Sequence, residues 1–381
     1  MIAYHPSYPS IDDLRARARR RIPRFAFEYL DGGCNEDVNL DRNTRELREV
    51  QLRPQYLRPF TGVRLDTELF GHTYSAPFGI APIGLQGLIW PGAPRILARA
   101  AREANIPFIL STVTTASIEE IAEITEGRCW YQLYHPAEDR ITEDILKRLE
   151  SAGVEVLVLL CDVPSFGFRP RDIRNGLSMP PRMTLRNIAQ MLGCPAWGVQ
   201  MLRQGIPQFA TMKRYMPDGM SMKQLGLYMN RTFDGRLSEE KVARLRARWK
   251  GKLVLKGVAG SEDAAAAVRL GLDGLIVSNH GGRQLDAGES SIRSLESIVA
   301  DFAGRIPLMV DSGLRDGPDV ARAMAVGADF TFLGRSFMYG VAALGNAGGR
   351  HTIELIRAQL KQVMEQVNCA HITGLPQHRV G

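Results

Sequence analysis

The chain has 381 residues, of which 45% are hydrophobic and 23% are charged, and this ordinary globular composition excludes a disordered chain, a collagen and a coiled coil. Its formal net charge of +7 indicates anionic partners, but it does not choose among nucleic acid, a membrane surface, phosphates and carboxylates. The five cysteines lie far apart without a CxxC pair, so we expect neither a disulfide framework nor a metal site.

The N-terminal residues contain no apolar segment of the kind found in secretory signals. The longest stretch without charged residues, 73–94, contains four prolines and is therefore a poor candidate for a membrane-spanning helix. We expect a protein of a reducing compartment that is soluble, or attached to a membrane surface without crossing it.

Residues 11–50 have the charged pattern of surface helices, and from about residue 75 short apolar runs alternate with amphipathic segments. The runs are rich in Val, Ile, Leu and Phe, as strands buried on both faces are. The predicted strands are 77–83, 107–111, 130–134, 154–160, 252–256, 274–278, 307–311 and 330–334. Helices are predicted between them at 95–104, 117–126 (with a capping box of Ser117 and Glu120), 141–152, 261–270, 291–302 and 317–326.

Eight strand–helix units in a chain of this length predict an α/β fold, a (β/α)8 TIM barrel with an N-terminal helical segment. A doubly wound open sheet is the alternative, because the same alternation permits it. The rhythm is interrupted once, by a long insertion after strand 4 that spans residues 163–250. A connection of that length is usually functional or mobile.

Polar and glycine residues follow nearly every predicted strand, where the active sites of barrels lie. A single one of these residues is more often an ordinary loop residue, but their repetition predicts a site at the C-terminal mouth. They are Ser111, Gln132, Tyr134, Asp162, Arg169, Lys256, Ser278, His280, Arg283, Asp311, Gly313, Arg315, Gly334 and Arg335.

The segment SNHGGRQLD (278–286) has the most specific chemistry. His280 is a candidate general base because the pKa of histidine lies near neutrality. Arg283 is a candidate partner for a carboxylate, which its planar guanidinium binds with two hydrogen bonds, and Arg169 is a candidate second partner. A purely structural histidine is the alternative.

The segments DSGLRDG (311–317) and LGRS (333–336) follow the last two strands, where barrels commonly bind phosphate. The backbone N–H groups of Gly313, Gly334 and Arg335, with the Arg315 side chain, predict an anion site, although simple turn geometry also explains glycines there. Lys256 is a candidate for stabilising negative charge on a reduced ring. Its alternative role is a salt bridge with Asp311.

Together these motifs resemble the FMN-dependent α-hydroxy-acid oxidase and dehydrogenase family, which includes glycolate oxidase, L-lactate dehydrogenase and mandelate dehydrogenase. The resemblance runs from about residue 10 to 370. Besides SNHGGRQLD it rests on FEYLDGG (27–33), APIGLQG (81–87), LST (110–112), YQLY (131–134), LVLKG (253–257), DSGLRDG and LGRS. It implies one FMN-binding barrel domain over residues 1–381.

The resemblance implies a role for each matching residue. His280 is expected to be the catalytic base, assisted in catalysis by Tyr29, Tyr134 and Arg283. Tyr29, Tyr134, Arg169 and Arg283 are expected to bind the substrate. The residues expected to bind the FMN cofactor are Pro82, Ile83, Gly84, Ser111, Gln132, Lys256, Ser278, Asp311, Gly313, Arg315, Gly334 and Arg335.

The implied reaction is oxidation of a lactate-like or mandelate-like L-2-hydroxy acid to the 2-keto acid, with electrons passed to a quinone-type acceptor. A soluble oxidase that reduces O2 to hydrogen peroxide is the alternative within the family. Outside it, a catalytically silent flavin-binding protein and an FMN-dependent isomerase of phosphorylated substrates are alternatives, and the His280–Arg283 arrangement argues against both.

Three positions depart from the family pattern. Leu160 stands where many members have Thr in T-x-D-x-P, and Ile83 replaces a common Thr, so two hydroxyls beside the flavin are absent. Gly84 stands where several oxidases have Ala; mandelate dehydrogenase resembles this sequence at that position, which favours a dehydrogenase. Val113 and Phe166 are expected to line the pocket for the substrate side chain.

The insertion segment 173–217 contains six basic residues, six methionines and no acidic residue. Such a composition suits an anionic membrane surface, and 194–211 is similar to the membrane-attaching segment of bacterial lactate and mandelate dehydrogenases. A lid over the active site is the alternative. We therefore expect a cytoplasmic protein, peripheral on the inner face of the cell membrane, which forms a homo-oligomer (a tetramer) and binds no nucleic acid.

Overall fold

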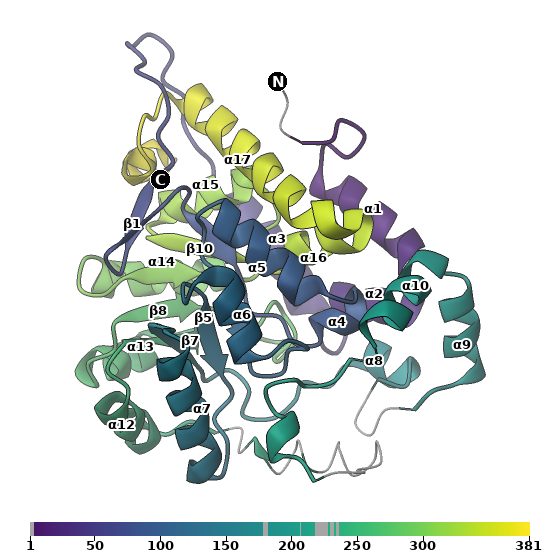
Figure 1. The fold of residues 1–381 in the computed structure, drawn as a ribbon. Helices are drawn as coiled ribbons and strands as arrows, with labels where there is room; N and C mark the ends of the chain where they lie inside the picture. Colours follow the sequence, from purple (N-terminus) through teal and green to yellow (C-terminus); the bar gives the residue numbers. More distant parts are fainter. Residues whose placement is uncertain (1–3, 178–181, 206, 218–227, 229–231, 234–235) are drawn as a thin grey trace.

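The protein is a closed eight-stranded parallel barrel surrounded by helices (Figure 1). The computed structural model describes residues 4–177, 182–205, 207–217, 228, 232–233 and 236–381. The strands are β3 (Phe78–Ile80), β4 (Ile109–Ser111), β5 (Trp130–Leu133), β6 (Val156–Leu160), β7 (Lys252–Val258), β8 (Gly274–Val277), β9 (Leu308–Val310) and β10 (Phe330–Leu333). All eight predicted strands are confirmed.

Closure distinguishes the barrel from the open-sheet alternative, which is wrong. The strand order is β3-β10-β9-β8-β7-β6-β5-β4, and the two end strands are joined by a parallel bridge between Ile80 and Phe108. The backbone N–H of Ile80 donates to the carbonyl of Pro107 over 2.9 Å at this seam. The carboxyl ends of the strands therefore meet in one mouth.

Helices follow the strands as expected. They are α5 (Ala93–Glu103), α6 (Ile118–Thr125), α7 (Asp139–Ser151), α12 (Glu239–Arg248), α13 (Ser261–Arg269), α14 (Ser291–Phe302), α15 (Gly317–Val326), α16 (Arg335–Leu344) and α17 (Gly348–Val367), with a short α4 (Gln86–Ile89) after β3. The predicted capping box at Ser117 is formed only in part. The Ser117 side chain accepts from the Glu120 N–H, whereas the Glu120 carboxylate pairs with Arg95.

A hairpin of β1 (Thr67–Leu69) and β2 (His72–Tyr74) packs against the barrel interior. Phe70, at the turn of this hairpin, lies 5.5 Å from the Trp130 ring, and Tyr74 lies 5.6 Å from Phe330. Tyr74, Trp130 and Phe330 belong to one buried cluster with inward-facing side chains of the strands, and the partly buried Phe70 packs against it. The barrel interior is therefore packed, and the space for a ligand lies at the mouth.

The predicted N-terminal helical segment is confirmed as α1 (Ile11–Arg21), α2 (Arg24–Asp31) and α3 (Val38–Glu49). α1 begins with a capping box of Ser10 and Asp13 and packs on α16. α2 ends at the mouth, where the Arg335 guanidinium donates to the carbonyls of Leu30 and Gly32 over 3.0 and 2.8 Å. Arginine thus satisfies carbonyls that the end of a helix leaves unpaired.

The insertion after β6 contains α8 (Pro170–Arg174), α9 (Leu185–Leu192), α10 (Pro195–Gln204) and the 3-10 turn η1 (Lys213–Tyr215). Residues 178–181 and 206 of the 173–217 segment lie outside the described residues. Figure 1 shows α9 and α10 beside α1 and α2. Trp197 of α10 fixes this position, since it is buried against Phe25 and its indole N–H donates to the Leu88 carbonyl over 3.1 Å.

Across the described part of the chain, no helix combines the length and the apolar character needed to cross a membrane.

A candidate active site at the mouth of the barrel

A cavity of about 480 Å³ opens where the strands end. The residues predicted for the site line it, with the exceptions of Ser111, Asp162 and Ser278, and Val113 and Phe166 line it as expected. The cavity therefore brings together residues of β5, β7 and β10, of the loops after β3, β6, β8 and β9, and of α2.

The two serines lie behind the cavity wall. The Ser278 hydroxyl accepts from the Lys256 ammonium over 2.8 Å and from the His280 backbone N–H over 3.1 Å. The buried Ser111 hydroxyl accepts from the Val113 N–H over 3.4 Å. Ser278 therefore positions two residues of the site in this structure, and direct contact of either serine with the flavin stays a prediction.

His280 is held by Asp162, a strand-end residue to which neither the sequence pattern nor the family resemblance gave a specific role. Its Nδ1 lies 3.1 Å from Oδ1 of Asp162, the second residue after β6. Burial lowers the pKa of His280, and Asp162 acts in the opposite direction. His280 is thus neutral near pH 7, and the other ring nitrogen, Nε2, is available to accept a proton.

Asp162 stays charged although it is buried. Burial alone would raise its pKa, but the interaction with His280, which includes a hydrogen bond, and the charge of Lys256 lower the pKa below the usual value. Its second oxygen, Oδ2, is buried without a hydrogen-bond partner among the described residues. The one sequence signal for Asp162 was its place directly after a buried strand.

The position of Asp162 beside His280 depends on a glycine, Gly257, in the neighbouring strand β7. Gly257 has a φ of +105°, and a Cβ atom there would lie 2.6 Å from the Cβ of Asp162. The register between β7 and β8 shifts at this point, between Lys256 and Val258. Only glycine adopts this backbone readily and leaves room for the carboxylate.

Two arginines lie at the substrate end of the cavity. Arg283 donates to the carbonyls of Tyr29 and Gly32 over 2.6 and 3.0 Å, and its guanidinium stacks over the Tyr29 ring at 4.8 Å. Arg169 donates to the Gln284 side chain over 3.0 Å. Burial and the like charge of Arg283 lower the pKa of Arg169 to about 10. A bound carboxylate would supply an opposite charge beside both guanidinium groups and so raise the pKa of Arg169 again.

Lys256 forms the salt bridge that the alternative interpretation predicted, since its ammonium lies 2.9 Å from the Asp311 carboxylate. Burial would lower the pKa of Lys256, but Asp311 and Asp162 raise it above its usual value. Both partners also line the cavity. The lysine is therefore a fixed buried cation at the cavity wall, and the salt bridge and a flavin contact are compatible.

The predicted phosphate site is built partly as expected. Gly334 is the N-cap residue of α16, so the positive end of this helix faces the cavity beside Gly313 and Arg315. The Arg335 side chain donates to the carbonyls of Leu30, Gly32 and Gly281, and the expected role of its backbone N–H at an anion stays a prediction. Burial and Arg315 lower the pKa of Arg335 to about 9, so an anion here would be favourable.

The cavity fits FMN in the chemistry of its two ends. One end has a helix N-terminus with two arginines, which suits a phosphate, and the other has the arginine pair that suits a carboxylate. Between them lie the apolar surfaces of Pro82 and Ile83 and the Lys256 ammonium. Gly84 allows the backbone of this wall to lie close to Val113, since a Cβ atom at position 84 would lie only 2.9 Å from Val113 Cγ2.

Comparisons with known proteins agree with this arrangement. The family model described as FMN-dependent dehydrogenase matches residues 18–381. The chain is 37% identical to L-lactate dehydrogenase of Vibrio parahaemolyticus over 95% of this chain and 96% of the relative. It is 38% identical to L-lactate dehydrogenase of Stenotrophomonas maltophilia, again over 95% and 96%.

Solved structures are similar over nearly the whole chain. The crystal structure of the monotopic membrane protein (S)-mandelate dehydrogenase superimposes with a TM-score of 0.91, at 33% identity, covering 97% of this chain and 98% of that one. A mandelate oxidase superimposes with a TM-score of 0.83, at 33% identity and 97% coverage of both chains. From fold, site and sequence together, the chain belongs to the FMN-dependent dehydrogenase family, and FMN is its cofactor.

Proposed function

We propose that this protein oxidises an L-2-hydroxy acid to the 2-keto acid and passes the electrons to a quinone-type acceptor. The observation that carries the proposal is one cavity that holds the neutral base His280, paired with Asp162, and the two arginines Arg169 and Arg283. The names of the relatives support the substrate class, since they are lactate and mandelate dehydrogenases.

Each protein group has a defined task in this reaction. Arg169 and Arg283 bind the substrate carboxylate, which orients the α-carbon and its hydroxyl toward His280. His280 accepts the proton that leaves the substrate, and the charge of Asp162 stabilises the imidazolium that results. Bound FMN would supply the acceptor for the two electrons that leave the α-carbon.

Tyr134 contributes a hydrogen-bond donor. Burial raises the pKa of its phenol well above the ordinary value, and the Asp162 charge adds to this effect. The phenol therefore stays protonated at neutral pH and donates to a substrate oxygen. Tyr29, whose ring lies under Arg283, is proposed as the second tyrosine of the substrate site.

The reaction and the acceptor are tested by the products. FMN-loaded protein is incubated with L-lactate or L-mandelate and either an artificial acceptor or O2, and the keto acid and peroxide are measured. We expect keto acid in both cases but fast turnover only with the artificial acceptor. Peroxide production at a similar rate would instead support the soluble oxidase.

Replacing Arg283 by lysine is expected to weaken substrate binding by about 10- to 100-fold, because lysine lacks the paired donors of the guanidinium. The check is the dependence of the flavin-bleaching rate on L-lactate concentration. A surface control, Arg305→Lys, leaves this dependence unchanged. An unaltered concentration dependence in Arg283→Lys would remove Arg283 from the substrate site.

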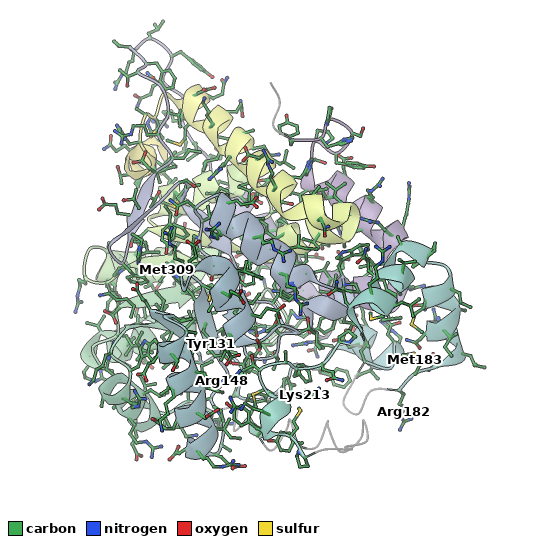
Figure 2. All side chains as sticks on the ribbon, viewed as in Figure 1. Tyr131, Arg148, Arg182, Met183, Lys213 and Met309 are labelled. Carbon is green, nitrogen blue, oxygen red and sulfur yellow. The ribbon has the colours of Figure 1, made fainter. Side chains whose placement is uncertain are left out.

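Attachment to an anionic membrane is proposed through the insertion. Leu185, Leu192 and Leu202 on α9 and α10 are 85%, 79% and 87% exposed. Figure 2 shows Arg182 and Met183 at the outer edge of the molecule on the same side, and Met183 is also exposed. Exposed apolar side chains among basic residues suit the headgroup region of a bilayer.

The triple change Leu185→Ser, Leu192→Ser and Leu202→Ser is expected to abolish flotation of the protein with vesicles that contain anionic phospholipid, because the apolar area available for burial is lost. Leu57→Ser is the control, since Leu57 is fully exposed on a different loop. Flavin bleaching by substrate should be kept. Wild-type protein that does not float with these vesicles would contradict membrane attachment and leave the lid alternative.

Two further parts of the proposal come from the resemblance alone: a homotetramer, and a position on the cytoplasmic face of the cell membrane. Sedimentation of the FMN-loaded protein tests the first. Accessibility to added protease in sealed vesicles of either orientation tests the second.

A further inference from the structure

A second cavity, of about 400 Å³, lies directly beside the catalytic one. The two share Tyr134, Val163 and Phe166 as lining residues, so these residues form a common wall between them. Nothing in the reaction described above uses the second cavity.

The backbone fixes the walls of this cavity. Phe233 packs edge-on against Tyr134, with ring centroids 5.6 Å apart at 60°. A bridge between Pro136 and Phe233 and a hydrogen bond from the Ala137 N–H to the Thr232 carbonyl hold Phe233 in place. Leu237 and the buried Leu160 add further apolar surface. Leu160 is one of the positions at which the chain departs from the family pattern.

Two polar side chains interrupt the apolar lining. His135 Nδ1 is buried and has no hydrogen-bond partner among the described residues. Buried ring nitrogens normally have such a partner, so this atom points to a ligand. Burial lowers the pKa of His135, so the ring is neutral, and in the tautomer that carries its proton on Nδ1 this atom is a donor. Arg236 lines the exposed rim.

We propose that this second cavity binds the ring of a quinone, with one carbonyl accepting from His135 Nδ1 and the other facing Arg236. The inference rests on the proposed function, since the hydroxy acid must first deliver electrons to the flavin. The quinone would take up the two electrons and the two protons that oxidation of the hydroxy acid releases and would become the quinol; bound FMN would carry the electrons between the two sites.

The lining distinguishes this ligand from the hydroxy acid. A carboxylate has its buried arginine pair, Arg169 and Arg283, in the catalytic cavity. The second cavity offers apolar walls with the two polar side chains of His135 and Arg236, which suit a flat, uncharged ring that carries carbonyl groups. The shared wall at Tyr134 places this ring next to the catalytic cavity.

The test uses duroquinone and the variant His135→Phe, which removes the N–H and fills the cavity. Calorimetric titration of the oxidised, FMN-loaded protein is expected to show binding by wild type and at least tenfold weaker binding by the variant. The kcat/KM for duroquinone should fall by the same factor. His371→Phe, at an exposed histidine outside the cavity, is the control. Arg236→Ala, at an exposed position with little risk to folding, should weaken binding severalfold.

Flavin bleaching by L-lactate separates this inference from the proposed function. Bleaching in His135→Phe at the wild-type rate, together with weak duroquinone binding, supports the quinone site. Wild-type duroquinone binding in both variants overturns it, as does an effect confined to the hydroxy-acid half-reaction, which would make the cavity part of the substrate pocket. Absence of bleaching in wild type would instead refute the proposed function itself.

Discussion

Replacing His280 with alanine is expected to leave FMN bound while slowing flavin bleaching by the hydroxy acid about 10²- to 10⁴-fold, which is the usual contribution of a general base. His280 is the neutral imidazole of the cavity, and its partner Asp162 leaves Nε2 as the ring nitrogen free for the substrate proton. Stopped-flow bleaching under anaerobic conditions measures the effect.

The control for this change is His371→Ala, at an exposed histidine outside the cavity, which should bleach at the wild-type rate. His280→Gln serves as a second variant with a side chain of similar reach. A loss of less than tenfold in both His280 variants would show that another group accepts the proton.

Replacing Asp162 with asparagine is expected to slow bleaching by about 10²- to 10³-fold, because the amide neither stabilises the imidazolium nor enforces the same ring tautomer. The pH profile should shift as well. Asp162 raises the pKa of His280, so its neutralisation lowers that pKa further. The rise of kcat/KM with pH, which follows loss of the His280 proton, therefore moves to lower pH in the variant.

Asp172→Asn is the matched control, because Asp172 is a buried carboxylate that lies near Arg169 and Arg283 but does not contact His280. It is expected to leave the position of the pH profile unchanged. An Asp162→Asn enzyme with a wild-type pH profile would contradict the role of Asp162 in setting the protonation of His280.

Much of the fold was predictable because parallel strands that are buried on both faces consist of short apolar runs in the sequence. The run at 154–160 and the run at 252–256 became neighbouring strands, β6 and β7. The site was predictable for a related reason, since the barrel brings the ends of all strands to one mouth. The location of His280 and Arg283 at this mouth could be predicted from their position directly after a strand.

The remaining features depend on contacts between distant segments. Asp162 reaches His280 only because Gly257 lacks a side chain, and no local pattern at 160–164 contains this information. The Arg335 guanidinium donates to carbonyls at the end of α2, more than 300 residues away along the chain, and no local pattern at 333–336 predicts these contacts. The orientation of α9 and α10 likewise follows from the packing of Trp197 on Phe25.

The most direct test of the account is anaerobic mixing of the FMN-loaded wild-type protein with the two enantiomers of lactate and of mandelate. At least one L-2-hydroxy acid is expected to bleach the flavin rapidly and yield one keto acid per flavin, while the D enantiomer leaves it oxidised. A flavin that stays oxidised with every L-2-hydroxy acid would contradict the proposed function.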